Sequence, residues 1–366
     1  MSRVASRLHL DRWTAVVPPL ALVLLAFTWG RDLPGYLVAI VAFFLTAAVL
    51  AAVHHAEVVA HRVGEPYGSL VLAVAVTVIE VALIVTLMTD NAEKNATLAR
   101  DTVFAAVMIT TNGIVGICLL LGAIRRRLAV FNAEGTGAAF GTVATLAGLS
   151  LVLPTFTTSE PGPQFSATQL VFAAIASVVL YGLFVTTQTV RHRDYFLPVT
   201  LGGDIVDDDH AERPAARTAR TSLALLGLAL VSVVGLAKGV SPTIERGVAD
   251  AGLPASVVGV VIALLVLLPE TIAAVRAALR DRVQTSLNLA LGSAMASIGL
   301  TIPAVALASV WLSGPLVLGL GASHMTLLAM TVAVGILTIV PGRATVLHGG
   351  VHIALFAAYV VLALSP

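Results

Sequence analysis

Two glutamates, Glu80 and Glu270, stand alone inside long apolar stretches of the sequence. Glu80 lies within residues 70–88 and Glu270 within residues 257–275, and each stretch is long enough and apolar enough to cross a bilayer as a helix. A charged side chain at the centre of such a span costs roughly 2.5–3.5 kcal/mol in insertion measurements, so it usually faces a bundle interior or a wet cavity. There it binds an ion or relays a proton. The alternative is a protonated side chain bonded to a neighbouring helix, but two such glutamates about half the chain apart favour a function.

Composition gives the class of protein that must position these carboxylates. Hydrophobic residues make up 58 % of the chain and charged residues 11 %, and the mean hydropathy is +0.97. A soluble domain carries about 25 % charged residues. We therefore expect an all-α polytopic membrane protein whose main partner is the lipid bilayer. The net charge of +1 points to no polyanion, and we expect neither a nucleic-acid partner nor a cofactor. The single cysteine, Cys118, excludes an intramolecular disulfide.

Hydropathy predicts about 11 transmembrane helices. The expected spans are residues 13–30, 36–53, 68–88, 103–123, 137–153, 169–190, 221–238, 255–279, 284–311, 324–340 and 345–364. The first span follows a basic head but no small-residue cleavage site, so we expect a retained helix rather than a signal peptide. Residues 191–220 form the one long polar stretch, which is either a solvated loop or an acidic regulatory segment.

The distribution of basic residues predicts the orientation. With the N-terminus in the cytoplasm, 16 of the 21 Lys and Arg residues fall on the cytoplasmic side and five on the other side. Such an excess is typical of the cytoplasmic face. We therefore expect a multi-pass protein of the cell (inner) membrane with a cytoplasmic N-terminus and an external C-terminus.

The span count also predicts an internal repeat. Without the first span, the chain divides into five spans plus five, and an odd number per half places the second half upside down in the membrane. We expect an N-terminal tail and extra helix at 1–34, one five-helix repeat at 35–190, a cytoplasmic acidic loop at 191–220 and a second five-helix repeat at 221–366. Glu80 and Glu270 fall in the second span of their repeats, so they should converge near the midplane. Pro269 removes one backbone hydrogen bond and frees a carbonyl near Leu265.

Further polar residues lie in or beside the predicted spans. Asn112, Asn288, Ser293 and Ser297 offer oxygen atoms, and Ser293 and Ser297 share a helix face because they are four residues apart. His54, His55, Glu57 and His61 form a cluster after the second span, which we interpret as a solvated helix end at the interface rather than a metal site. His348 and His352, also four apart, leave open a minor alternative, an intramembrane metalloenzyme.

Two stretches of sequence resemble a known family. The run from Ala56 through Gly64-Glu65-Pro-Tyr-Gly68 to Glu80 resembles the cation/proton exchangers of the calcium/cation antiporter superfamily. The run 269–293, which contains Pro269-Glu270 and Leu289-Ala-Leu-Gly-Ser293, is similar to the bacterial ChaA-type sodium(calcium, potassium)/proton antiporters. The sequence departs from the Gly-Asn-x-x-Glu signature of the wider superfamily, because Val76-Thr77 and Val266-Leu267 replace the Gly-Asn pairs.

The resemblance implies a secondary active transporter, not an enzyme, that exchanges a cation for protons by alternating access. Glu80 and Glu270 would form the shared cation and proton site, and Glu57 and Glu65 would be accessory or gating residues. Other expected ligands are Thr77, Asn112, Asn288, Ser293 and Ser297. The transported cation would be calcium, or else sodium or potassium. A cation channel is the main alternative, although the internal repeat favours a transporter.

Overall fold

The structure is a computed structural model that describes residues 12–31, 33–64, 67–90, 96–200, 214–254, 256–311 and 314–365. Across these ranges nine helices are long and apolar enough to span a membrane, and a bent pair, α9 and α10, makes a tenth span. Helix α1 is apolar but, at 17 residues, slightly shorter. The expectation of an all-α polytopic membrane protein with about 11 spans is confirmed.

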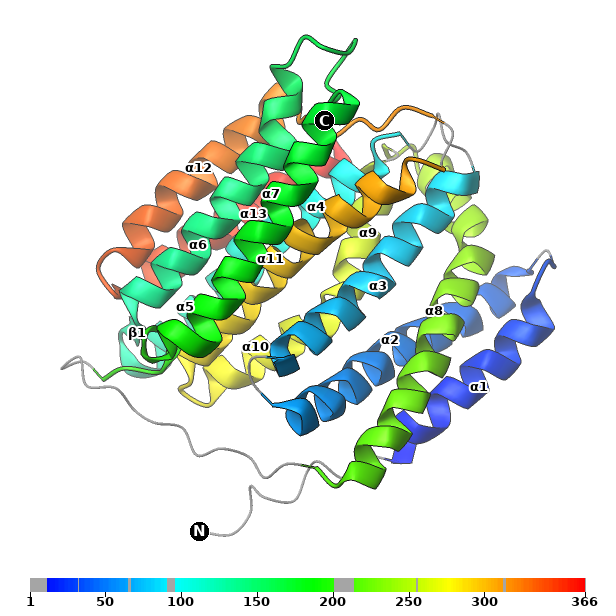
Figure 1. Cartoon of the computed structure of the whole chain (residues 1–366), viewed down its shortest axis with the longest axis horizontal. Coiled ribbons are helices and arrows are strands. Elements are labelled where there is room, and N and C mark those ends of the chain that lie inside the picture. The colour runs from blue at the N-terminus through cyan, green and yellow to red at the C-terminus, as the bar shows by residue number, and fades with distance from the viewer. Residues whose placement is uncertain are drawn as a thin grey trace. The chain divides into compact units, whose positions relative to one another are not determined.

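Figure 1 shows the elements in their order along the chain. They are α1 (Arg12–Thr28), α2 (Gly35–Val63), α3 (Tyr67–Asp90), α4 (Leu98–Met108), η1 (Ile109–Ile114), α5 (Val115–Arg126), β1 (Ala129–Val130), α6 (Ala133–Ala147), η2 (Gly148–Val152), η3 (Leu153–Thr155), α7 (Ala167–Thr186), η4 (Thr187–Arg191), η5 (Arg193–Phe196), α8 (Ala216–Asp250), α9 (Ser256–Val266), α10 (Leu268–Leu279), α11 (Val283–Ala308), α12 (Ala322–Ile339), β2 (Arg343–Ala344) and α13 (Val346–Leu364).

The helices form two compact units, and each unit takes helices from both halves of the sequence. The first unit contains α1, α2, α3 and α8, and the second contains α4 to α7 and α9 to α13. In the first unit, α2 packs against α1, α3 and α8. Glu80 belongs to the first unit and Glu270 to the second.

A buried histidine ties α1 to α2. Pro18 has no N–H to donate to the carbonyl of Thr14 one turn earlier, so an isolated helix would leave that oxygen without a partner. The Nε2 atom of His55 lies 2.9 Å from this oxygen and is its hydrogen-bond donor. Helix α2 extends ten residues beyond its predicted end at 53 and buries His55 completely. The interpretation of the histidine cluster as a solvated helix end is therefore wrong for His55.

Glycines shape the corner between α2 and α3. Gly64 ends α2 at φ 78°, a left-handed conformation that L side chains rarely adopt. A Cβ atom at Gly68 would lie only 2.6 Å from the carbonyl oxygen of Ala60. Both glycines belong to the stretch that resembles the exchangers, and their role there is to let α3 turn back closely against α2.

Two short antiparallel pairings in the second unit connect the two halves of the sequence. β1, which follows the third span of the first repeat, pairs with β2, which follows α12. Gln164, which follows the fourth span of the first repeat, pairs with Val317, which precedes α12. In each pairing, the connection between the third and fourth spans of one repeat meets the connection between the fourth and fifth spans of the other repeat.

These pairings have the arrangement expected of an inverted repeat. They lie at opposite ends of α12, so the equivalent connections of the two repeats emerge on opposite sides. Helix packing has the same reciprocal arrangement, because α5 packs against α13 while α7 packs against α11. Both contacts join the third span of one repeat to the fifth span of the other.

The polar loop is shorter than predicted. Helix α8 runs from Ala216 to Asp250, so it starts before residue 221 and extends past residue 238. The turns η4 and η5 fill residues 187–196. The acidic residues of this loop, Asp204, Asp207, Asp208, Asp209 and Glu212, lie outside the described residues.

Candidate functional site

In the first unit, Glu80 lies in the middle of α3 and is buried, with 3 % of its surface exposed. Thr77 precedes it by three residues, so the two side chains lie on the same face of the helix. Thr77 is also buried, and within the described part of the chain its Oγ1 atom has no hydrogen-bond partner. A buried hydroxyl without a partner costs about 1–3 kcal/mol, so an unpaired oxygen one turn from a buried carboxylate indicates a ligand-binding role.

The expected accessory residues lie along the preceding helix and its end. Glu57 is half-buried on α2, which packs against the helix that carries Glu80. Glu65 lies outside the described residues, so its gating role stays a prediction.

In the second unit, Glu270 lies where a membrane span is broken. Helices α9 and α10 meet at Leu267 with a bend of 53°. Pro269 is the second residue of α10 and Glu270 the third. The carbonyl oxygen of Leu267 accepts bonds from both the backbone N–H (2.9 Å) and the hydroxyl (2.7 Å) of Thr271. The positive end of the α10 dipole therefore lies beside the Glu270 carboxylate, where it favours a negative charge.

Asn112 lies in η1, a buried π-helical turn inside the span 98–126. Its Nδ2 atom donates to the hydroxyl of Thr331 at 2.9 Å, and its Oδ1 atom lies 3.1 Å from Nδ1 of His352. The η1 turn contacts α10, which carries Glu270, and also α11, α12 and α13. The structure thus places Glu270 and Asn112 on contacting elements, and π-helical turns of this kind often mark functional positions.

The third polar group lies on α11. Both functional groups of the Asn288 amide are bonded, because Oδ1 accepts from Gln284 at 2.8 Å and Nδ2 donates to the backbone oxygen of Phe196 at 2.7 Å. This side chain fastens α11 to η5, and its role as an ion ligand stays a prediction. Ser293 is half-buried and Ser297 is buried, and they lie on one face as predicted.

Sequence reasoning missed several polar residues of the second unit. Thr301 continues the face of Ser293 and Ser297, is fully buried, and has no bond to its Oγ1 atom within the described residues. Its spacing of four residues from Ser297 was a usable signal. Thr331 and Thr338 of α12 also stand out in an apolar span. Only the packing shows that Thr331 and His352 bond to Asn112 and that Thr338 bonds to His352.

The histidines give no support for a metalloenzyme. His348 is half-buried and bonds to Thr345 at the start of α13, whereas His352 is buried against Asn112. Among the described residues, no group of three His, Cys, Asp or Glu side chains is placed to share a metal ion. The convergence of Glu80 and Glu270, which belong to different units, stays a prediction.

With this geometry in place, comparison with known proteins identifies the family. The family described as "Sodium/calcium exchanger protein" matches residues 11–190 and 221–365. The chain belongs to this family. Its members are membrane transporters, so the predicted antiporter class, cation transport and transmembrane character are confirmed.

Individual relatives cover nearly the whole chain. The putative ionic transporter y4hA of Sinorhizobium fredii (strain NBRC 101917 / NGR234) is 48 % identical over 98 % of this chain and 97 % of its own length. The sodium-potassium/proton antiporter ChaA of Escherichia coli (strain K12) is 34 % identical over 94 % of both chains. The crystal structure of the H⁺/Ca²⁺ exchanger CAX is only 14 % identical but superposes with a TM-score of 0.70, over 95 % of this chain and 86 % of that one. The exchanger fold is therefore shared.

Proposed function

We propose that this exchanger-family protein is a secondary active transporter that exchanges a cation for protons by alternating access. The observation that carries the proposal is that the buried Glu80 carboxylate and the Thr77 hydroxyl, which has no hydrogen-bond partner among the described residues, lie on one face of an apolar helix. Glu270, at the break between α9 and α10, would supply the second carboxylate. Lipid and small inorganic cations are the expected partners.

Competition between protons and cations at these carboxylates would couple the two fluxes. A buried carboxylate without a counter-ion is more stable when it is protonated, and a bound cation restores the charged form. The same oxygen atoms therefore hold either protons or the cation. Two glutamates can carry two protons or neutralise one divalent ion, which is the chemical basis of obligatory exchange.

Thr77, Asn112, Ser293 and Ser297 are the further ligands we propose. Asn112 has one oxygen lone pair left after its bond to His352, since an amide oxygen has two. Asn288 is a further proposed ligand, because its Oδ1 atom also accepts one hydrogen bond, from Gln284, and keeps one lone pair. Thr77 and the buried, apolar Leu267 occupy the two asparagine positions of the signature, so the two amide ligands expected from the wider superfamily are missing.

The names of two relatives support protons as the counter-ion and leave the cation open. ChaA is a sodium-potassium/proton antiporter and CAX an H⁺/Ca²⁺ exchanger, so protons are common to both. Calcium takes six to eight oxygen ligands, and two amide ligands that the wider superfamily offers are missing here. We therefore propose calcium as a substrate of modest affinity, with sodium or potassium also transported.

Transport by the full-length protein in proteoliposomes tests this proposal. Calcium, sodium and potassium gradients are imposed one at a time, and internal pH is followed with an entrapped dye. We expect protons to move against the cation in every case that supports transport. Cation flux without proton movement would indicate a channel and contradict the proposal, as would the absence of any flux.

The proposed orientation is a cytoplasmic N-terminus in the inner membrane. A cysteine introduced at Asp204 or Glu160 in a Cys118→Ser background tests it, because the positive-inside count places these positions on opposite faces. We expect an impermeant thiol reagent to label position 160 but not position 204 in intact cells. The reverse pattern would overturn the proposed orientation.

A further inference from the structure

A hydrogen-bonded chain of buried side chains fixes the orientation of the Asn112 amide. The hydroxyl of Thr331 donates to the backbone oxygen of Leu327 at 2.8 Å, so its oxygen accepts the bond from Nδ2 of Asn112. A second neighbour of Nδ2 is the hydroxyl oxygen of Thr111, whose own hydrogen is donated to Val107 at 2.6 Å. The Oδ1 atom must therefore face His352.

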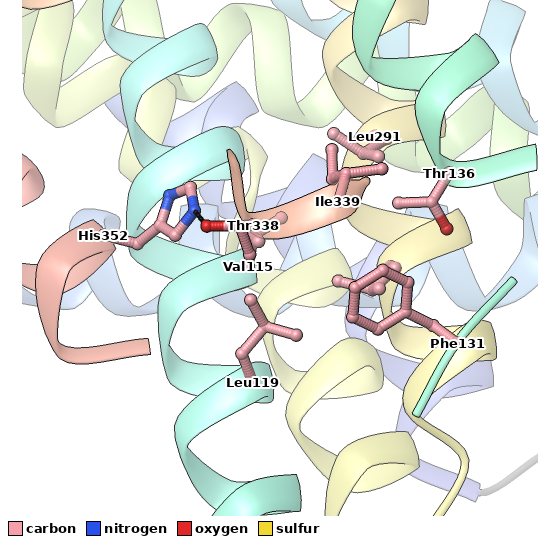
Figure 2. A pocket seen from close by; sticks show the side chains of 9 residues that line it. Val115, Leu119, Phe131, Thr136, Leu291, Thr338, Ile339 and His352 are labelled. Carbon is pink, nitrogen blue, oxygen red and sulfur yellow. Dashed lines mark hydrogen bonds between the residues drawn. The ribbon is translucent and has the colours of Figure 1, made fainter. Parts of the chain in front are cut away.

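This orientation also defines the tautomer of His352. An amide oxygen can only accept a hydrogen bond, so the Nδ1 atom of His352 carries the hydrogen that lies between it and Oδ1 of Asn112. In the neutral ring, Nε2 is then the acceptor, and its partner is the hydroxyl of Thr338 at 3.2 Å (Figure 2). Every polar atom of the imidazole is thus committed to a protein group.

The surroundings of His352 exclude a looser, water-mediated arrangement. The ring is 1 % exposed and borders a cavity of about 10 Å³, whose other walls are mostly the apolar side chains labelled in Figure 2. Apolar cavities of this kind stay dry, so no water relay is expected there. The ring also interacts with the backbone of Thr111, the residue before Asn112. His352 therefore acts directly on the π-helical turn.

We propose that His352 is a positioning residue for cation exchange, which holds the Asn112 amide and the η1 turn in the geometry that the cation site needs. The inference rests on the proposed function, in which Asn112 is a ligand. Its structural basis is that η1 contacts α10, the helix that carries Glu270, while His352 reaches η1 from α13. His352 itself does not touch the cation.

Two substitutions separate the two bonds of the ring. His352→Asn places an amide N–H near the position of Nδ1 and keeps the donor to Asn112, whereas His352→Gln places its amide near Nε2 and keeps only the Thr338 side. We expect His352→Gln to raise the KM for the cation about tenfold, the effect of one lost buried hydrogen bond. His352→Asn should stay within about threefold of the wild type.

Thermal unfolding in detergent and a control position complete this comparison. Each variant loses one of the two hydrogen bonds of the ring. If His352 had a merely structural role, the two variants would lose the same stability and would show the same KM. Equal KM values would overturn the proposal. His348→Gln, one turn earlier on α13, should leave KM unchanged, because the half-buried ring of His348 bonds to Thr345 and not to Asn112.

A double-mutant cycle tests whether His352 acts through Asn112. If it does, His352→Gln should add no further increase in KM to that of Asn112→Leu, because the bond is already absent. Independent tenfold effects that multiply would contradict the proposal. Wild-type protein that does not exchange cations would refute the proposed function instead, so the two failures are distinguishable.

Discussion

The two membrane glutamates occupy different backbone settings. Glu80 lies inside the continuous helix α3, with Thr77 on the same face, whereas Glu270 begins a new helix after a 53° bend. Pro269 accounts for the difference, since the position before Glu80 is Ile79, which keeps the helix intact. In the proposed site, the two repeats would therefore offer the ion different groups: a side-chain hydroxyl beside Glu80, and a helix terminus with freed backbone groups beside Glu270.

The largest expected effect comes from neutralising either carboxylate. Glu80→Gln and Glu270→Gln should each lower exchange at least 100-fold, on the order expected when a buried charged ligand is lost, because neither an amide nor a single remaining carboxylate can exchange protons for the cation. Flux in proteoliposomes measures the loss. The exposed Glu134→Gln is the matched control and should be neutral. Near-normal transport by either glutamine variant would show that the two settings are not parts of one site.

Restoring a backbone N–H donor at the break between α9 and α10 should make the span of Glu270 more like the continuous helix α3. Pro269→Ala supplies an N–H for the carbonyl of Leu265, straightens the span and shifts Glu270. We expect exchange to fall about tenfold or more, since a 1 Å shift in a functional group can cost on the order of 10²-fold. Pro242→Ala, in α8, is the control. An unchanged rate for Pro269→Ala would mean that the bend serves packing alone.

Removing the hydroxyl beside Glu80 should have a smaller and more specific effect. Thr77→Val keeps the side-chain shape, and we expect the KM for the cation to rise about three- to tenfold. Stability should not fall, because the lost hydroxyl has no hydrogen-bond partner within the described structure. Transport assays and thermal unfolding are compared with those of Thr142→Val, whose hydroxyl is exposed. A loss of stability without a change in KM would show that Thr77 contributes to helix packing and is not a ligand of the cation.

The smallest effect concerns the other end of α10. Arg126 donates a hydrogen bond to Asp281 at 2.9 Å and thereby holds the pKa of this exposed carboxyl below its ordinary value. The resulting stabilisation is present above the ordinary pKa of about 3.9 and is lost as the pH falls through the lowered value. Asp281→Asn keeps a residue that tolerates the left-handed φ of 62°.

We expect the Asp281→Asn protein to melt slightly below the wild type at neutral pH and at the same temperature in acid. Transport should be unchanged, since an exposed ion pair contributes little. A large loss of transport in this variant would show that the ion pair between Arg126 and Asp281, and not the break at Pro269, sets the position of α10.

The sequence was most informative where one residue contradicts its surroundings. Glu80 and Glu270 stand out in apolar spans, and Pro269 predicts a lost backbone hydrogen bond beside Glu270. The 53° bend of the span at this point was not predicted. The extent of α2 was not predictable in this way, because falling hydropathy after Val53 suggested a helix end. His55 is buried there because a proline in α1 leaves a carbonyl for it, a relation between residues 41 positions apart.

The polar network around Asn112 could not be assembled from the sequence for the same reason. Asn112, Thr331 and His352 come from three spans, and nothing in their spacing indicates that they meet. Asn288 was among the candidate ligands from the sequence, but only the packing shows that its amide also fastens α11 to η5. Tertiary packing decides which polar side chains of a span remain available to an ion.

Proton release on cation binding, measured by isothermal titration calorimetry of the purified protein in buffers of different ionisation enthalpy, tests the central claim most directly. If Glu80 and Glu270 hold either protons or the cation, the wild type should release protons when it binds calcium, sodium or potassium, and affinity should fall as the pH is lowered. Each single glutamine variant should release fewer protons, and the double variant none. Cation binding by the wild type without proton release, or undiminished release by the double variant, would contradict the shared site.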